Sequence, residues 1–230
     1  MMPPRSFPRP SLHRSLVAAI ALALAGAPAV SLAGAPRARV PRPIKLAAPK
    51  SFAAAVTAVE KATGVKSEAF DAAKAPAPPL EGRSFALDSN TADRLLAGSH
   101  AAFRKAGFYL FRYERGFGLP GERDRVAVLA TTDRDAVLRR MGTAAGHGTL
   151  TTDALVAWLQ QLEKDQPFEL PEIGVDYVAG RFARAPEDAQ AMARRTIEIA
   201  PALLSGGDRE VEVEILAEEI RANRTLYLIW

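Results

Sequence analysis

The C-terminal stretch from Pro167 to Trp230 constrains the fold most, because strand-like and helical patterns alternate within it. Its two extended runs meet near Gly174, and two helical segments separate them from a closing apolar strand. The four segments are Phe168–Arg184, Pro186–Ala200, Glu210–Ala222 and Thr225–Trp230. Because the last strand is apolar on both sides, we expect it at the centre of a sheet or buried on both faces.

Upstream of this stretch, helical and strand patterns also alternate. The expected elements are helices over Ser51–Thr63, Asp88–Ala106, Asp133–Met141 and Asp153–Lys164, and strands over Ser84–Leu87, Phe108–Tyr113 and Val126–Ala130. The last two strands flank a charged, glycine-containing turn, so we expect them to pair. The sequence therefore predicts one α+β domain over residues 51–230, with a single mixed sheet on one side and helices packed over it.

The first 33 residues have the three-part organisation of a secretory signal peptide. Arg5, Arg9 and Arg14 precede the apolar run Leu16–Leu32, and the segment ending at Ala33 offers a small-x-small cleavage site. An uncleaved anchor is the alternative, because about 20 apolar residues span a bilayer, but glycine and proline interrupt this run. We expect cleavage near Ala33, a periplasmic or secreted protein, and no membrane span after cleavage.

Residues 34–50 are rich in proline, arginine and alanine, which predicts an extended, mobile tether. Residues 1–50 hold eight of the 30 Lys and Arg and none of the 26 Asp and Glu, so residues 51–230 carry a net charge of −4. Nucleic-acid binding requires basic residues on the folded domain itself. The charge distribution therefore argues against a nucleic-acid partner.

Cysteine is absent from the sequence. Its absence excludes disulfide bonds, thiolate metal sites and cysteine nucleophiles. No G-x-S-x-G motif and no phosphate-binding loop with Lys-Ser/Thr is present either. The sequence thus indicates no cofactor, no metal site and no catalytic residue.

Several short segments between Asp124 and Trp230 follow one another in a characteristic order and spacing. They are Asp133–Thr143, Ala157-Trp158-Leu159, Leu162-Glu163-Lys164, Pro167–Leu170, Leu216–Ile220 and Thr225–Leu228. Together they resemble an uncharacterised bacterial family, the domain of unknown function numbered 4253. Ala200-Pro201 stands where the family pattern has Cys-Pro, and the chain ends on Ile229-Trp230 without the family's terminal acid. The resemblance implies a fold and an order of elements, and no activity.

His147, between Gly146 and Gly148, is the histidine placed best for chemistry. A loop histidine of this kind is suited to act as a base or as a metal ligand. No second ligand accompanies it at a local spacing, which favours a structural turn. Binding of an anion by the backbone N–H groups of this glycine-rich loop is the alternative.

Asp176, Glu218 and Trp230 are the remaining candidate binding residues, beside Gly146 and His147. Asp176 lies within an apolar strand, where its carboxylate needs a partner unless it points to water. Glu218 belongs to an acidic pair on a helix. Trp230 is either a core residue or the mark of a strand edge that binds a partner through free backbone groups.

The hypothesis we prefer is an exported, non-catalytic binding or interaction module whose partner is another protein. One alternative is an extracytoplasmic hydrolase that uses His147 and carboxylates, which requires His147, Asp176 and an acid near Glu218 in one cleft. A second alternative is an immunity-like inhibitor of a toxin. The oligomeric state is left open.

Overall fold

Seven strands form one mixed sheet within the residues that the computed structural model describes, 42–71, 80–117, 119–144 and 150–230. The strands are β1 (Glu68–Ala69), β2 (Gly82–Leu87), β3 (Tyr109–Glu114), β4 (Asp124–Leu129), β5 (Phe168–Ile173), β6 (Tyr177–Phe182) and β7 (Thr225–Ile229). Their order across the sheet is β1-β2-β4-β3-β5-β6-β7. The predicted α+β fold with a single mixed sheet is confirmed.

The helices begin at side chains that cap them. They are α2 (Phe52–Thr63), α3 (Ser89–Lys105), α4 (Arg134–Met141), α5 (Thr152–Asp165), α6 (Ala189–Ile199), the 3₁₀ turn η1 (Pro201–Leu203) and α7 (Arg209–Asn223). Ser51 and Thr151 accept a backbone N–H at the starts of α2 and α5, as their sequence positions indicate. The expected start of α6 at Pro186 is wrong: Asp188 accepts the Ala191 N–H at 2.8 Å, and this cap starts the helix at Ala189.

Antiparallel pairs make up most of the sheet, and one parallel contact joins its two parts. β3 and β4 form the expected hairpin, and β2 pairs with β4 on the other side. β5, β6 and β7 form an antiparallel group. The groups meet where β5 runs parallel to β3, with Arg112 in register with Glu172.

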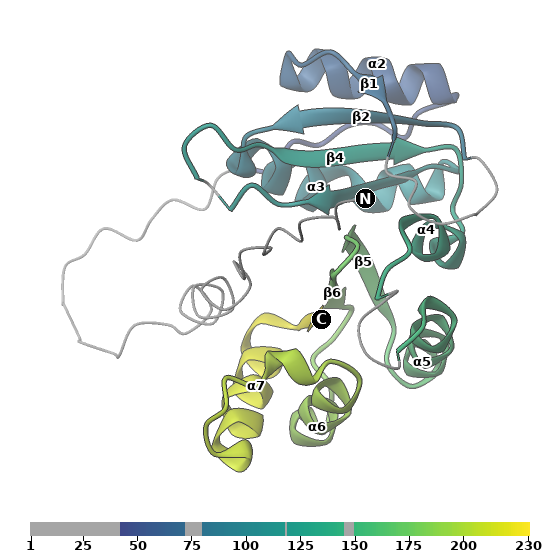
Figure 1. Cartoon of the computed structure of the whole chain (residues 1–230). Helices are drawn as coiled ribbons and strands as arrows, with labels where there is room; N and C mark the ends of the chain where they lie inside the picture. The colour runs from purple at the N-terminus through teal and green to yellow at the C-terminus, as the bar shows by residue number, and fades with distance from the viewer. Residues whose placement is uncertain (1–41, 72–79, 118, 145–149) are drawn as a thin grey trace, which may run out of the picture.

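Two apolar cores lie on opposite faces of the sheet, because successive residues of β3 and β4 point to opposite faces. Leu110 and Val128 belong to a core with α2 and α3, whereas Phe111 and Leu129 belong to a larger core with α4, α5, α6 and α7. Figure 1 shows α2 and α3 with the upper strands and α4 to α7 around β5 and β6. The expectation that the helices lie on one side is therefore corrected, since β3 and β4 are apolar on both faces.

β7 is an outer strand of the sheet, which corrects its expected central position. One face of β7 is apolar because Leu226 and Leu228 are fully buried in the larger core. On the other face, Tyr227 and Ile229 are half-buried, and the Tyr227 ring lies 6.4 Å from that of Tyr177. Local aromatic packing thus accounts for apolar residues on both faces of an edge strand.

Residues 42–46 are held on α3, whereas the sequence predicts a mobile tether over 34–50. The Ile44 N–H donates to Arg94 O at 2.8 Å, and the Ser99 hydroxyl donates to Ile44 O at 2.7 Å. A Cβ atom at Gly98 would lie 2.2 Å from Ile44 O. The glycine in the middle of α3 therefore lets this segment approach the helix backbone closely.

Residues 1–41 lie outside the described residues, so the signal peptide and the first part of the tether stay predictions. Within the described ranges, no helix is long and apolar enough to cross a membrane.

Candidate functional site

A buried arginine lies at the seam where β3 meets β5. The side chain of Arg112 is 2% exposed and forms ion pairs with three carboxylates. Its Nη2 contacts Asp93, its Nε lies 3.1 Å from Asp124 Oδ2, and its Nη1 lies 3.7 Å from Glu172 Oε2. Because a buried charge is costly without partners, these carboxylates make the arginine tolerable inside the sheet.

Asp124 connects Arg112 to the start of α3 and to the β3–β4 turn. Its Oδ1 accepts the Ser89 hydroxyl at 2.9 Å and the Gly116 N–H at 2.8 Å. The side chain of Asp124 is 1% exposed. One carboxylate thus ties a helix, a hairpin turn and the buried guanidinium together.

Glu172 accepts a second arginine from the opposite side. Arg115 Nε and Nη2 donate to its two carboxylate oxygens, each at 2.7 Å, in a bidentate pair. Burial by itself would lower the pKa of Arg115, but the charge and hydrogen bonds of Glu172 outweigh it and raise the pKa. Arg115 therefore stays charged, and Glu172 bridges the two arginines.

His100 is a buried histidine on α3. It is 3% exposed, and its Nδ1 lies 2.7 Å from Leu110 O. Because a carbonyl oxygen only accepts, Nδ1 carries the proton and Nε2 is left as an acceptor. Burial lowers the pKa of His100. Among the described residues, Nε2 has no hydrogen-bond partner.

A hollow of about 230 Å³ lies beside these groups, between α3 and strands β3, β5 and β6. It is lined by Asp93, Leu96, Ala97, His100, Ala101, Arg112, Glu169, Pro171, Glu172 and Arg181. We call it the polar hollow. Charged side chains and a short apolar wall share its lining, so the arrangement can hold a small polar molecule.

The outer edge of β7 is a second candidate site. In an antiparallel pair, alternate residues exchange backbone hydrogen bonds with the neighbouring strand. Phe182 N donates to Arg224 O at 2.8 Å, and Trp230 N donates to Asp176 O at 2.9 Å, so the even-numbered residues pair with β6. The odd-numbered residues of β7 turn their N–H and C=O groups outward, where no described strand pairs with them.

The predicted site residues are only partly brought together. Gly146 and His147 lie outside the described residues. Asp176 is exposed in the turn between β5 and β6, not within a strand as expected, and its carbonyl accepts the Trp230 N–H. Trp230 is half-buried, and its Nε1 donates to Ile199 O at 3.0 Å.

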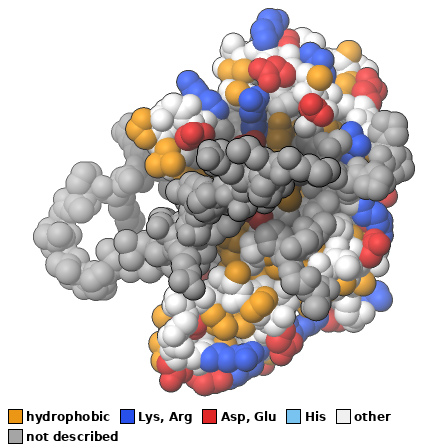
Figure 2. All heavy atoms as spheres, in the orientation of Figure 1, with side chains coloured by type: hydrophobic (Ala, Val, Ile, Leu, Met, Phe, Trp, Pro, Cys, Tyr) orange, Lys and Arg blue, Asp and Glu red, His pale blue; other side chains and the backbone are white. Residues whose placement is uncertain are grey.

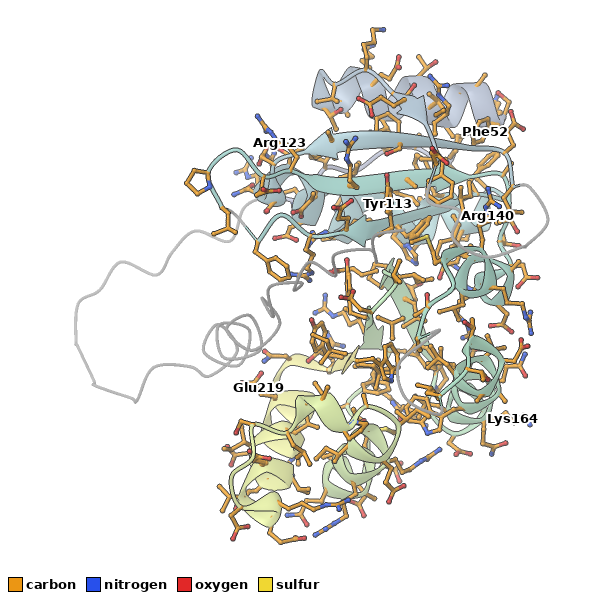
Figure 3. All side chains as sticks on the ribbon, viewed as in Figure 1. Phe52, Tyr113, Arg123, Arg140, Lys164 and Glu219 are labelled. Atoms are coloured by element: carbon orange, nitrogen blue, oxygen red, sulfur yellow. The ribbon has the colours of Figure 1, made fainter. Side chains whose placement is uncertain are left out.

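Glu218 is exposed on α7. Figure 3 shows the neighbouring Glu219 on α7 far from Tyr113 on β3, so this acidic helix and the seam lie apart. The hydrolase hypothesis requires a cleft that contains His147. Because His147 lies outside the described residues, this hypothesis stays a prediction.

Sequence reasoning missed Arg112, although a usable signal was present. The run Tyr109–Tyr113 places one arginine among aromatic and aliphatic residues, and a charge in an apolar strand requires a partner. The partners of Arg112 could not be named, because Asp93, Asp124 and Glu172 come from three separate segments.

Charges of both signs are interspersed over the face shown in Figure 2. The described residues contain no group of three or more His, Cys, Asp and Glu side chains able to hold a metal ion. The absence of a nucleic-acid partner stays a prediction.

A family model described as Domain of unknown function (DUF4253) matches residues 125–230, so the C-terminal part of the chain resembles that family. The match begins at β4 and excludes β3, Arg112 and His100. No curated protein and no solved structure matches the chain.

Proposed function

We propose that the protein is an exported, non-catalytic binding module that receives an extended segment of another protein along the outer edge of β7. The observation that carries the proposal is the edge position of β7, with the backbone groups of Thr225, Tyr227 and Ile229 turned away from β6. An added strand satisfies such groups with main-chain hydrogen bonds. Export rests on the signal-peptide pattern of the first 33 residues.

Contacts with the core and with β6 hold the edge strand in its extended form, which favours binding because little order has to be gained. Leu226 and Leu228 are fully buried, and Trp230 holds the end of the strand through Asp176 and Ile199. These contacts fix the outward groups in an extended line before any partner arrives.

The side chains beside the edge supply an aromatic surface. Tyr227 and Tyr177 lie on the same face, and burial raises the pKa of Tyr227 to about 12. Both rings therefore stay uncharged at neutral pH. An extended segment with apolar or aromatic residues at alternate positions suits this face, because side chains of a strand contact their neighbours at every second residue.

The test compares two substitutions at one position. Tyr227→Pro removes an outward N–H while keeping the pairing with β6, since proline is tolerated at the solvent side of an edge strand. Tyr227→Ala removes the ring and keeps the N–H. We expect recovery of a partner from a periplasmic extract, followed by crosslinking to β7, to fall strongly with proline and less with alanine.

Thermal denaturation of both variants is the control that they remain folded. Equal recovery by the folded proline variant and the unaltered protein would contradict strand addition at β7. N-terminal sequencing of the protein recovered from the cell envelope tests export separately, with a new N-terminus near residue 34 expected.

A further inference from the structure

Helix α7 carries apolar residues on two opposite sides. One side packs into the larger core through Val213, Ala217 and Ile220. On the other side, Val211 is 52% exposed and Ile215 is 55% exposed. Figure 1 shows α7 at the outside of the molecule, beside α6. A helix that serves only the core needs a single apolar stripe, so the fold does not account for the outward one.

The outward residues follow the spacing of a coiled-coil seam. Exposed positions recur after four, three and four residues, at Val211, Ile215, Glu218 and Ala222. In a heptad repeat, this spacing belongs to the a and d positions, which face the second helix of a pair. Because α7 has 15 residues, the seam is about 22 Å long at about 1.5 Å per residue. The outward side therefore has the spacing that pairs with one further helix.

The charges beside the seam indicate the chemistry of that helix. The flanking heptad positions hold Glu212, Glu214, Glu219 and Arg221. Three of these four charges are negative, and Glu218 places a further carboxylate within the seam itself. Flanking charges form ion pairs across coiled coils and select the partner. A helix with Lys or Arg at the matching positions therefore complements α7.

These carboxylates keep their charge available for a partner. Among the described residues, the ion pair made by α7 joins Glu210 to Arg194 of α6, not to the outward side. Glu212 accepts the Ser205 hydroxyl, and Glu219 accepts the Asn223 amide at 2.6 Å. Both donors are uncharged, so neither contact neutralises its carboxylate.

The same charges disfavour two other occupants of this side. A second copy of α7 would bring acidic flanks together, and like charges at neighbouring positions of packed helices are unfavourable. An anionic membrane surface attracts Lys and Arg and would repel the carboxylates. A basic helix from another protein is the occupant that the charges favour.

We propose that the outward side of α7 docks a basic amphipathic helix of another protein. Aliphatic residues of that helix pack on Val211 and Ile215, and a Lys or Arg pairs with Glu218. This surface is distinct from the edge of β7, and either proposal stands without the other.

The test is titration of a fluorescein-labelled peptide with the purified protein, followed by fluorescence anisotropy. The peptide is about four helical turns long and consists of leucine at the a and d positions and lysine elsewhere. We expect saturable binding that weakens as salt is added. A second peptide has Glu in place of every Lys, and a third has the first composition in scrambled order. We expect no binding of the acidic peptide and at least tenfold weaker binding of the scrambled one.

Substitutions on α7 locate the binding surface. Ile215→Gln removes an exposed aliphatic side chain but keeps a good helix former, and we expect at least tenfold weaker binding. Glu218→Gln should weaken binding and reduce its dependence on salt. The matched controls lie in the β3–β4 turn: Leu119→Gln, since Leu119 is also 55% exposed, and Glu122→Gln, an exposed acid. Both controls should bind the peptide as the unaltered protein does, and thermal denaturation checks that all four variants are folded.

Equal affinities of the folded Ile215→Gln and Leu119→Gln variants would overturn the proposal. So would equal affinity for the scrambled peptide, because simple attraction to an acidic surface needs no seam. Analytical ultracentrifugation and vesicles of phosphatidylglycerol test the other occupants. Self-association that Ile215→Gln abolishes would assign the surface to a second copy, and vesicle binding that Ile215→Gln abolishes would assign it to a membrane. Either result would also overturn the proposal.

Discussion

The two parts of the chain, residues 42–124 and residues 125–230, contribute differently to one sheet. The second part contains β4 to β7 except for the first residue of β4, yet β4 and β5 are not neighbours, because β3 from the first part lies between them. The first part supplies most of the core under α2 and α3, to which β4 of the second part adds Val126 and Val128. The region that matches the family model therefore lacks β3, the strand that lies between its own β4 and β5.

The seam where β3 meets β5 is also chemically distinct from the strand pairs around it. β3 and β4 carry apolar residues into two cores, whereas β3 and β5 meet at Arg112 and Glu172. Charge pairing requires particular partners, while apolar packing accepts many. The seam therefore specifies which strands are neighbours.

The largest expected effect comes from separating the two parts. We expect a fragment of residues 125–230 to show no cooperative thermal unfolding, because without β3 the strands β4 and β5 have no shared neighbour. Circular dichroism and amide NMR dispersion measure this. Adding a fragment of residues 42–124 should restore dispersion. A well-dispersed spectrum from the isolated fragment 125–230 would show that its strands pair without β3.

Substitution at the seam ranks second. Arg112→Met leaves the buried carboxylates of Asp124 and Glu172 without their shared cation, and we expect the free energy of unfolding to fall by about 3–5 kcal/mol. Urea denaturation measures the change. The control is Arg139→Met, which breaks an exposed ion pair: the side chain of Arg139 is 48% exposed and that of its partner Asp153 is 78% exposed. We expect this substitution to lower the free energy of unfolding by less than about 1 kcal/mol.

If Arg112→Met lowers the free energy of unfolding by less than about 1 kcal/mol, the buried ion pairs at the seam contribute no more than an exposed ion pair. That outcome would contradict the special role of the seam.

A third test concerns the N-terminal segment on α3. Gly98→Ala would normally stabilise a helix by about 1 kcal/mol. Here the added Cβ would lie 2.2 Å from Ile44 O, so we expect destabilisation by about 1–3 kcal/mol and faster hydrogen exchange at the Ile44 amide. Ser99→Ala, which removes the hydroxyl bound to Ile44 O, should also speed this exchange while leaving α3 uncrowded. If Gly98→Ala is more stable than the unaltered protein, the segment around Ile44 moves away from α3 without measurable cost, and the prediction is contradicted.

The smallest effect is expected at the start of α7, far from the seam. The Ser205 hydroxyl, together with the Gly207 and Ser205 N–H groups, lowers the pKa of Glu212 below its usual 4.5. Stability from this carboxylate is therefore fully present above pH 4.5 and is lost as the pH falls through the lower folded pKa. We expect Glu212→Gln to be less stable than the unaltered protein at pH 7, and this gap to narrow in acid. A gap that is constant between pH 7 and pH 3 would contradict this role.

Local features were predictable from the sequence because neighbours in the chain create them. Ser51, Asp88, Thr151 and Asp208 cap helices through amides two or three residues away. The pattern therefore indicates Ser51 and Asp208 directly and narrows the other two caps to Asp88–Asn90 and Thr151–Thr152. The β3–β4 hairpin followed from two apolar runs around one turn. Pro186 indicated a helix start because proline suits the first helical position. The helix instead begins after Asp188, whose carboxylate accepts the Ala191 N–H, because a proline side chain has no acceptor for this group.

The candidate sites were predicted less well. Trp230 drew attention to the last strand, but the edge position of that strand depends on where β6 lies. The environment of His100 depends on its contact with Leu110, and that of Arg112 depends on three carboxylates, those of Asp93, Asp124 and Glu172. None of these relations has a fixed spacing in the sequence, because each depends on which strands and helices become neighbours.

By itself, the sequence determined the alternation of helices and strands, the approximate helix caps, the absence of cysteine chemistry and the likeness of the C-terminal part to one family model. Only the tertiary structure decided that β3 lies between β4 and β5, that Arg112 joins three carboxylates, and that β7 is an edge. The physical reason is range: caps and periodicity act over one helical turn, whereas strand order and charge partners are selected by packing between segments far apart in the chain.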